Sequence, residues 1–492
     1  MGVKALTTGL FALSSLSNAY AALDSTFFKL FDTIEKDVVI IGGGASGSHA
    51  AVRLREDYGK SVVVIEKEAI LGGHVDTYYG DKTGVPRDYG VQVYFEYEDA
   101  LDFIKRFNCT LVPGLAPSGA TTTKYVDFST GKALVNYTEP DAGAVTTAII
   151  AMHNVLVSKG YDKMIEPGFW NLPPGPQIPD DLLLPVSQFA AKYNVTPALS
   201  RMYQSTGGGP AAQQKRFQDV MTLTFLQSFS PAWMRVFWGE IGMYHIDGGN
   251  QGLYNKIAAL LGKDVLYNTV VLGAQRTDTG VTLLVSGAQG TKVIKAKKLL
   301  MAVPPTRENL LPFDLNDAET DLFSKTMYGR YGTAIVRHSS LTPGQELYNM
   351  PTSAVQDPYT PFVNNPHILS FSSYGNDTDL FSIGTSGAGT PYLLYGQTVA
   401  TAVAQIELQN MANAGTIPKL NGKLLEVVEW SDHGPGGFGV SAADMRAGWM
   451  SQFYGLQGKR STWFTGGAIA IDFSTQLWKM NDEVLKRMIA AW

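Results

Sequence analysis

The chain has 492 residues, of which 45% are hydrophobic and 17% charged, and its formal net charge is −5. This length exceeds what one compact core normally supports, so two or three domains are expected, and the composition excludes a disordered chain. The slightly acidic balance gives no electrostatic reason to bind nucleic acid or an anionic membrane surface.

The N-terminal residues have the pattern of a secretory signal peptide. Lys4 supplies a positive charge, residues 5–16 form an apolar stretch, and Ala19-Tyr20-Ala21 is a small-x-small cleavage site. The apolar stretch is too short to span a bilayer, and no later stretch of the sequence reaches spanning length. We expect residues 1–21 to be removed in the secretory pathway and the protein to be secreted. A helix packed on the first domain is the alternative.

Other short features bear on the same expectation. The sequons at Asn108, Asn136 and Asn376 are compatible with a secreted glycoprotein. Cys109 is the single cysteine, so no internal disulfide can form and the fold must depend on its core. The seven histidines show no zinc-ligand spacing, so we expect no metal site.

Residues Asp37–Glu66 predict a strand, a glycine turn, a helix and a second strand. Val38–Ile41 is a short β-branched run of the length that a buried parallel strand needs. Gly42, Gly44 and Gly47 follow at once in a G-x-G-x-x-G pattern. Their roles would be a tight turn, close approach to a pyrophosphate and close packing of helix on strand.

The helix after this turn, which we expect to include Ala45, would direct its positive N-terminal end at phosphates. The second strand, Val62–Ile65, ends at Glu66, which follows Gly44 by 22 residues. An acid at this distance can accept hydrogen bonds from an adenosine ribose. Together these residues predict a dinucleotide site, and an α/β crossover without a ligand is the alternative.

The next segments resemble the flavin-containing amine oxidase superfamily. Gly72-Gly73-His74 resembles its Gly-Gly-Arg signature against the flavin pyrophosphate, with His74 in place of arginine. The stretch Asp88–Tyr94, which contains Gln92, resembles the stretch beside the isoalloxazine ring. The resemblance implies FAD rather than a soluble nicotinamide cofactor.

Two later segments resemble the same superfamily. Val265–Val271 predicts a strand in which Val270 fits a valine that contacts the adenine by its backbone, and Ala302-Val303-Pro304-Pro305 matches a later strand ending. Trp463-Phe464-Thr465-Gly466-Gly467 resembles the final strand-to-glycine turn. The helix after Gly466 and Gly467 would point its N-terminus at the pyrimidine end of the flavin.

We therefore predict an α/β protein with a Rossmann-type FAD-binding domain built from three separated segments, plus an α+β substrate or cap domain. The FAD-binding segments are residues 34–110, 240–313 and 426–492, and the cap consists of residues 111–239 and 314–425. Helices are expected at 100–107, 186–193, 217–229 and 397–412, and a strand at 331–338.

Several positions depart from the superfamily pattern. The segment Gly436–Gly439 resembles the one that carries a flavin-linked cysteine and a tyrosine in monoamine oxidases, but here Phe438 and Gly439 occupy those places. We therefore expect non-covalent FAD. The region 330–337 offers arginines but no lysine to hold a water near the flavin, and Asp472 is the acid nearest the final glycine turn. These departures argue against amine oxidation but not against FAD binding.

The combined pattern resembles the β-cyclopiazonate dehydrogenase-like proteins of fungal secondary metabolism and, more distantly, the polyenoic fatty acid isomerases. Trp463 is a candidate wall of the substrate site, with a core position as its alternative. His433 is a candidate base, with a structural surface histidine as its alternative. Tyr94, beside the expected flavin, is a weaker candidate of the same kind.

Three functions remain open from the sequence. The first is an oxidoreductase, a dehydrogenase or oxidase, that removes a hydride from a bulky apolar small molecule, sometimes with ring closure. The second is a double-bond isomerase of a polyunsaturated substrate, with no net oxidation. The third is a non-catalytic flavin-binding protein.

Overall fold

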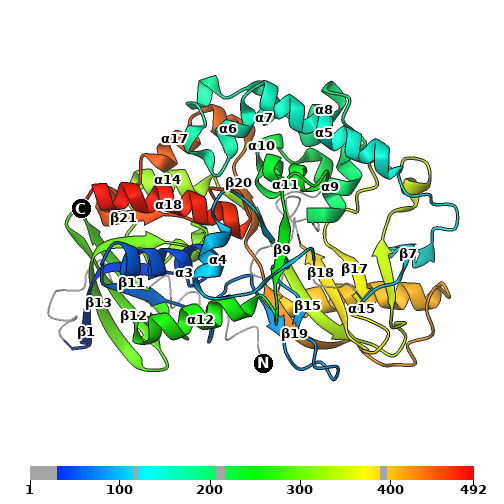
Figure 1. The fold of residues 1–492 in the computed structure, drawn as a ribbon, viewed down its shortest axis with the longest axis horizontal. Helices are drawn as coiled ribbons and strands as arrows, with labels where there is room; N and C mark the ends of the chain where they lie inside the picture. Colours follow the sequence, from blue (N-terminus) through cyan, green and yellow to red (C-terminus); the bar gives the residue numbers. More distant parts are fainter. Residues whose placement is uncertain (1–29, 116–118, 207–215, 388–395) are drawn as a thin grey trace.

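The computed structural model describes residues 30–115, 119–206, 216–387 and 396–492. Within these ranges the chain forms two seven-stranded sheets that lie side by side, with a layer of helices above them (Figure 1). The predicted signal peptide, residues 1–21, lies outside the described residues.

The first sheet has the strand order β10-β2-β1-β13-β12-β11, and β21 pairs with β13. The pairs of β1, β2, β10, β13 and β21 are parallel, whereas β11, β12 and the far part of β13 form an antiparallel meander. The strands are β1 (Asp32–Ile41), β2 (Val62–Ile65), β10 (Val265–Leu266), β11 (Val270–Thr277), β12 (Gly280–Gly287), β13 (Gly290–Met301) and β21 (Thr462–Phe464). Because they come from three separated parts of the chain, the predicted Rossmann-type architecture is confirmed.

Strand β1 shows why its apolar run is continuous. Val38 and Ile40 pack into a core with the helices α3 (Ala45–Val52), α12 (Gln251–Leu261) and α18 (Ser474–Ala490), whereas Val39 packs into the core on the other face. Both faces are therefore covered, as in other parallel sheets. Full burial of each such side chain contributes roughly 1.5–3 kcal/mol.

The strand predicted at Val265–Val271 is two strands in the structure. Asn268 lies between β10 and β11 with φ of 48°, in the left-handed region that asparagine tolerates better than most residues. The turn releases β11 from β10 and lets it pair with β12 instead.

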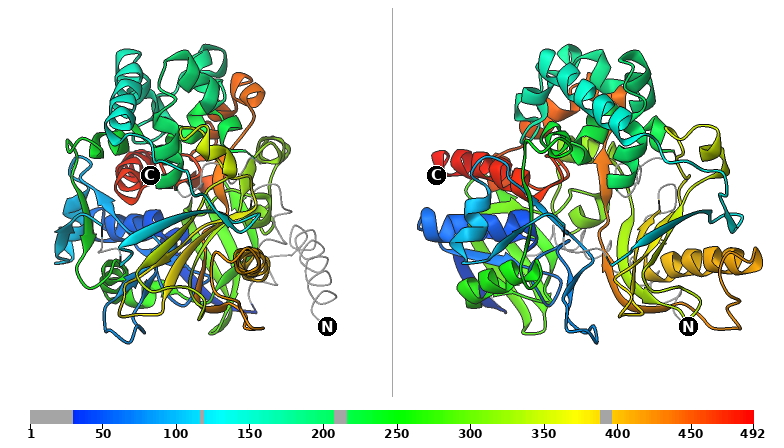
Figure 2. Two further views of the ribbon diagram at one scale, coloured as in Figure 1. Left: turned by 90° about the vertical axis from the view of Figure 1, so that its right-hand side faces the viewer. Right: turned by 45° about the vertical axis from the view of Figure 1, so that its right-hand side comes forward.

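The second sheet has the order β19-β15-β18-β17-β16-β7-β8 and is antiparallel except for the pair β16–β7. Its strands are β7 (Thr122–Asp127), β8 (Lys132–Ala133), β15 (Tyr331–Arg337), β16 (Gln345–Asn349), β17 (His367–Ser373), β18 (Phe381–Ser386) and β19 (Glu426–Asp432). Helix α15 (Gln397–Asn413, orange) packs on this sheet through Ala404, Leu408 and Met411 (Figure 2). The predicted strand at 331–338 and helix at 397–412 are thus present.

Strand β19 belongs to this second sheet. The third FAD-binding segment was predicted to begin at residue 426, but residues 426–432 pair with β15, for example Ala334 with Trp430. The pairing carries residues 426–432 away from the first sheet, so that part of the predicted boundary is wrong.

The upper layer consists of helices from residues 142–236 together with two later ones. They are α5 (Ala142–Ser158), α6 (Tyr161–Ile165), α7 (Asp180–Leu183), α8 (Val186–Lys192), α9 (Ala198–Thr206), α10 (Thr222–Ser228), α11 (Pro231–Val236), α16 (Ala442–Arg446) and α17 (Trp449–Tyr454). The prediction of a single helix at 217–229 is wrong. Val220 and Met221 are extended there, and Val220 accepts a hydrogen bond from the backbone of Val186.

Shorter elements connect these layers. They are β3 (Thr77–Tyr78), β4 (Arg87–Asp88), β5 (Tyr94–Phe95), β6 (Leu111–Pro113), β9 (Met243–Ile246), β14 (Met327–Gly329), β20 (Gly436–Gly439), α4 (Leu101–Arg106), α13 (Arg307–Leu310) and α14 (Asp317–Ser324). None of the described helices is both long and apolar enough to cross a membrane. In the same residues, no group of three or more His, Cys, Asp or Glu side chains is arranged to hold a metal ion.

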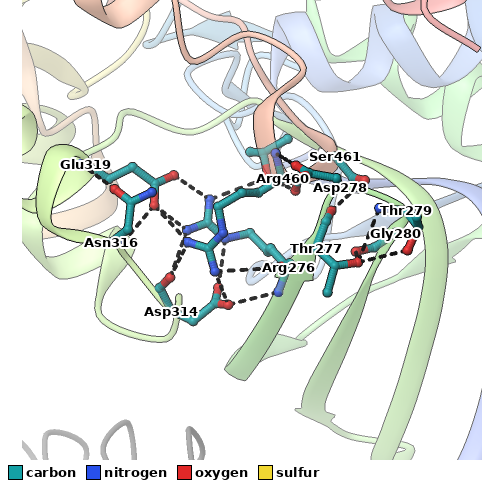
Figure 3. A network of polar contacts seen from close by, with 11 residues as sticks. Arg276, Thr277, Asp278, Thr279, Gly280, Asp314, Asn316, Glu319, Arg460 and Ser461 are labelled. Atoms are coloured by element: carbon teal, nitrogen blue, oxygen red, sulfur yellow. Dashed lines mark hydrogen bonds and ion pairs between the residues drawn. The ribbon is translucent and has the colours of Figure 1, made fainter.

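A buried charge network fastens the antiparallel part of the first sheet to α14 (Figure 3). Arg276 on β11 donates to Asp314 over 2.9 Å and to both carboxylate oxygens of Glu319 over 2.9 Å each. Arg460, in the turn before β21, donates to Glu319 over 3.0 Å and also to Asp314. The side chains of Arg276 and Glu319 are 2% and 4% exposed, so each charge depends on its partners.

This burial predicts a large effect of Glu319→Gln, which keeps the shape of the side chain and its capping role but removes the charge. We expect a loss of about 3–5 kcal/mol in the free energy of unfolding, because Arg276 keeps a buried charge with one anionic partner fewer. The matched control is Asp321→Asn on the same helix, which breaks an exposed pair with Lys325 and should cost under about 1 kcal/mol. Denaturant unfolding of both variants measures the difference, and equal losses would contradict the burial argument.

The pairing of Glu319 with the arginines also makes the destabilisation by Glu319→Gln depend on pH. Burial opposes ionisation of Glu319, but Arg276 and Arg460 hold its pKa below the usual value. A lowered pKa contributes stability above the unfolded-state pKa, and this stability is lost as the pH falls through the folded-state pKa. The difference between wild type and Glu319→Gln should therefore shrink in acid.

Candidate functional site

A large cavity, of about 1810 Å³, is lined by residues of the first sheet, the second sheet and the helical layer. Sites for one small molecule commonly measure about 300–1,000 Å³. The cavity therefore has room for a dinucleotide together with a second molecule.

The glycine turn after β1 forms one wall of this cavity. Gly42 has φ of 94°, which favours glycine, and a Cβ at Gly47 would lie 1.8 Å from the carbonyl oxygen of Gly42. A Cβ at Gly73 would lie 2.8 Å from the Cα of Gly44. Two of the three predicted roles therefore have physical counterparts, the tight turn at Gly42 and the close packing of α3 on the strand at Gly47, while the approach of Gly44 to a pyrophosphate stays a prediction.

The N-terminus of α3 opens onto the cavity. Gly44 is its N-cap and provides no side-chain acceptor, and Ala45 and Ser46 at the start of the helix line the cavity. The first N–H groups of a helix have no partner within the helix and attract anions. The donor set and the absence of side chains fit a pyrophosphate.

Glu66 has a role that its spacing did not reveal. Its Oε2 accepts a hydrogen bond from the backbone N–H of Gly43 over 2.6 Å, and its Oε1 accepts one from Glu68 over 2.8 Å. Burial raises the pKa of this carboxyl. Glu66 lines the cavity and also fixes the glycine turn to the end of β2.

Most of the residues predicted to bind the cofactor lie on the cavity wall. They are Gly42, Gly44, Ala45, Glu66, Gly72, Gly73, His74, Gln92, Val270, Gly466 and Gly467. Gly47 is the exception, because it packs against the backbone of Gly42 behind the turn. Val270 is 49% exposed, and its position at the cavity agrees with a backbone contact to a base.

Two of the three predicted catalytic residues lie elsewhere. Tyr94 is 1% exposed and stacks on Trp478 within the core of the first domain, at a centroid distance of 5.8 Å. Trp463 is 4% exposed, belongs to the same core and lines a separate cavity of about 420 Å³ with Trp170 and Arg487. Alternate residues of a strand face opposite sides, and Trp463 points to the α18 side of β21. The structure therefore supports the alternative that Trp463 is a core residue.

His433 lines the cavity. It is only 7% exposed, so the alternative that it is a structural histidine on the surface is wrong. Its Nε2 lies 3.2 Å from Oδ2 of Asp76, and the hydroxyl of Ser431 donates to the same oxygen over 2.7 Å. A carboxylate only accepts, so Nε2 of His433 carries the shared proton. Nδ1 is then the nitrogen that can accept a proton.

The ring of His433 stacks on that of His74, with centroids 4.5 Å apart and planes inclined by 15°. Burial, with smaller contributions from the nearby His433 and Lys67, lowers the pKa of His74 to about 3. His74 is therefore neutral and cannot supply the positive charge that arginine gives at this position in the superfamily pattern. The helix N-terminus and Lys67, which also lines the cavity, remain as sources of positive potential for a pyrophosphate.

The second sheet supplies aromatic residues that sequence reasoning missed. Tyr331 and Trp430 line the cavity, and Gly332 makes room for Trp430, since a Cβ there would lie 2.4 Å from the indole. The only available signal was the closeness of Trp430 to His433 in the sequence. Pairing of β19 with β15 is what places them on this wall.

The cap and the segment before α18 complete the cavity. Trp233 from α11 lies 4.7 Å from Phe473 between ring centroids. Asp472 lines the cavity and is accessible from it. The protein around the cavity separates its carboxyl from bulk water, and this desolvation raises the pKa of Asp472 to about 7. Asp472 also lies against the glycine turn, because a Cβ at Gly467 would be 2.6 Å from its Oδ1.

Comparisons with known proteins agree with this geometry. The model of the NAD(P)-binding Rossmann-like domain family matches residues 40–107. The FAD-dependent oxidoreductase oblC of Cochliobolus heterostrophus is 31% identical over 474 residues, which cover 93% of this chain and 92% of that protein. β-Cyclopiazonate dehydrogenase of Aspergillus oryzae is 32% identical over 473 residues, 94% of each chain.

Solved structures share the fold. A fatty acid isomerase of P. acnes that produces CLA has a TM-score of 0.69 at 18% identity, covering 92% of this chain and 98% of that chain. Putrescine oxidase bound to putrescine has a TM-score of 0.60 at 16% identity, covering 93% and 100%. At this identity the likeness concerns the fold alone. By the relatives that match over most of its length, the chain belongs to the family of FAD-dependent oxidoreductases that includes β-cyclopiazonate dehydrogenase.

Proposed function

We propose that this FAD-dependent oxidoreductase acts on a bulky apolar small molecule of secondary metabolism, as a dehydrogenase or oxidase that can also close a ring. The observation that carries the proposal is one continuous cavity with two chemically different ends. Glycine turns and a helix N-terminus form one end, and aromatic side chains from the second sheet and the cap form the other. β-Cyclopiazonate dehydrogenase, at 32% identity, supports a natural-product substrate.

FAD fits the first end. Gly44, Gly73 and the start of α3 would hold the pyrophosphate, and the backbone near Val270 would meet the adenine. The turn at Gly466 and Gly467 would meet the ring system. When bound, FAD supplies the redox chemistry by accepting two electrons and a proton as a hydride.

The protein would contribute orientation, water exclusion and proton handling. Tyr331 and Trp430 would hold an apolar substrate against the cofactor end, which places the reacting bond within near-attack distance. Asp76 keeps the Nε2 proton of His433 in place, so Nδ1 would accept a proton from the substrate.

The test is a comparison of metabolites with and without the gene, followed by anaerobic mixing of the accumulated metabolite with purified protein. We expect bleaching of the flavin absorbance and a product lighter by two hydrogens. A product of unchanged mass would identify an isomerase instead. No spectral response to the accumulated metabolite would indicate a non-catalytic flavin-binding protein.

Replacement of a glycine at the proposed pyrophosphate site tests the position of FAD. A Cβ at Gly44 would stand 3.5 Å from Gly73, an ordinary contact, so Gly44→Val should fold but block the approach of the pyrophosphate. We expect yellow wild-type protein and flavin-free Gly44→Val at a similar yield. Gly252→Val on α12, where nothing lies within 4 Å, is the control and should stay yellow. Full flavin content in the Gly44 variant would place FAD elsewhere.

We also propose that FAD is held without a covalent bond, because Phe438 occupies the place of the linking cysteine. Precipitation with acid should leave the yellow colour in the supernatant. Colour in the pellet would contradict the proposal and point to a histidyl link, for which His74 on the cavity wall would be the first position to examine by peptide mass spectrometry.

Finally, we propose that the protein enters the secretory pathway. The support is the N-terminal sequence pattern, and all three sequon asparagines, Asn108, Asn136 and Asn376, are exposed. Sequencing of the protein from its native host should find a mature N-terminus near Ala22. An intact Met1 would refute the proposal.

A further inference from the structure

The cationic side chains that line the cavity are unevenly paired. Three cationic side chains line it: Lys67, Arg201 and Arg330. Lys67 lies 3.5 Å from Glu68, and Arg330 lies 2.6 Å from Asp432. Arg201, on α9, makes no ion pair with any described carboxylate, and its guanidinium lies over the ring of Phe237.

The rest of the sequence offers little that could pair with Arg201. Residues 116–118, 207–215 and 388–395 contain no Asp or Glu, and residues 1–29 contain only Asp24. Every other acid of the chain is therefore among the described residues. Arg201 is exposed, and its charge has no carboxylate partner among the described residues.

An aromatic ring lies beside Arg201. Its guanidinium carbon lies 5.9 Å from the ring centroid of Phe237, a contact that orients the planar group. Phe237 leads through Phe229 to Trp233, and Trp233 contacts Phe473 just before α18. Trp233, Phe237 and Phe473 all line the cavity, so an apolar wall runs from Arg201 toward the final glycine turn.

We propose that Arg201 binds a carboxylate carried by the otherwise apolar substrate, at the cap end of the cavity. The inference rests on the proposed function and gives its substrate class an acidic group. A guanidinium matches a carboxylate with two parallel hydrogen bonds, a geometry that neither lysine nor a neutral amide reproduces. Held there, the acid directs the apolar body of the substrate along the aromatic wall.

The cofactor phosphates are not the partner of Arg201. Helix α9 belongs to the upper helical layer on the side of the second sheet, whereas the glycine turn lies at the start of α3 in the first domain (Figure 1). The pyrophosphate cradle contains glycines and helix N–H groups, and Arg201 contributes nothing to it.

The test uses the flavin-loaded protein and fluorescent probes with one apolar body. Pyrenebutyrate carries a carboxylate and pyrenebutanol a neutral hydroxyl, and binding of each is measured by fluorescence titration. We expect wild type to bind pyrenebutyrate about tenfold to a hundredfold more tightly than pyrenebutanol, as a charge-assisted pair would give. Arg201→Met, which keeps an unbranched apolar stem but removes the guanidinium, should bind both probes alike, and Arg201→Lys should recover part of the preference.

Arg235→Met is the matched control. Arg235 is an arginine of the cap that pairs with Glu240 and does not line the cavity, so its loss should leave the preference intact. An undiminished preference in Arg201→Met, an absent preference in wild type or an equal loss in Arg235→Met would each overturn the proposal. Failure of the redox function is seen separately, since a missing spectral response to the accumulated metabolite would leave the probe preference of Arg201 unchanged.

Discussion

The close contact between two glycine segments is the constraint on which the site depends. Gly44 and Gly73 meet with no space for a side chain on Gly73, and Glu66 holds the intervening turn by accepting the N–H of Gly43. The contact aligns the end of β1, the start of α3 and the segment that leads to His74 and Asp76. Without it, neither the phosphate cradle nor the histidine pair would have a fixed position.

The second sheet and the residue that follows it add polar and aromatic side chains to the cavity beside this phosphate-binding end. Strand β19 ends at Asp432, so that His433 emerges beside Asp76 from the first domain, with Ser431 donating to the same carboxylate. These hydrogen bonds connect the two domains across the cavity. His433, the proposed proton acceptor, is therefore positioned by the domain that would hold the cofactor, while its aromatic neighbours come from the domain that would hold the substrate.

The sequence placed Gly42, Gly44 and Glu66 correctly on one cavity wall because local spacing determines their positions: they belong to one strand–turn–helix–strand unit. It predicted the catalytic end poorly because long-range pairing determines that end. Trp463 is three residues from Gly466, yet strand alternation turns its ring to the opposite face of the sheet. His433 resembled a surface residue until the pairing of β19 with β15 buried it, and Arg201 lies in the cap, where no motif guided the prediction.

The most direct test is a crystal structure of the yellow protein. The arrangement predicts a pyrophosphate between Gly44 and Gly73 and a flavin ring near Gly466, with its open face toward Tyr331 and Trp430. Flavin density outside this cavity, or a ring that faces the core side of β21 where Trp463 lies, would contradict it.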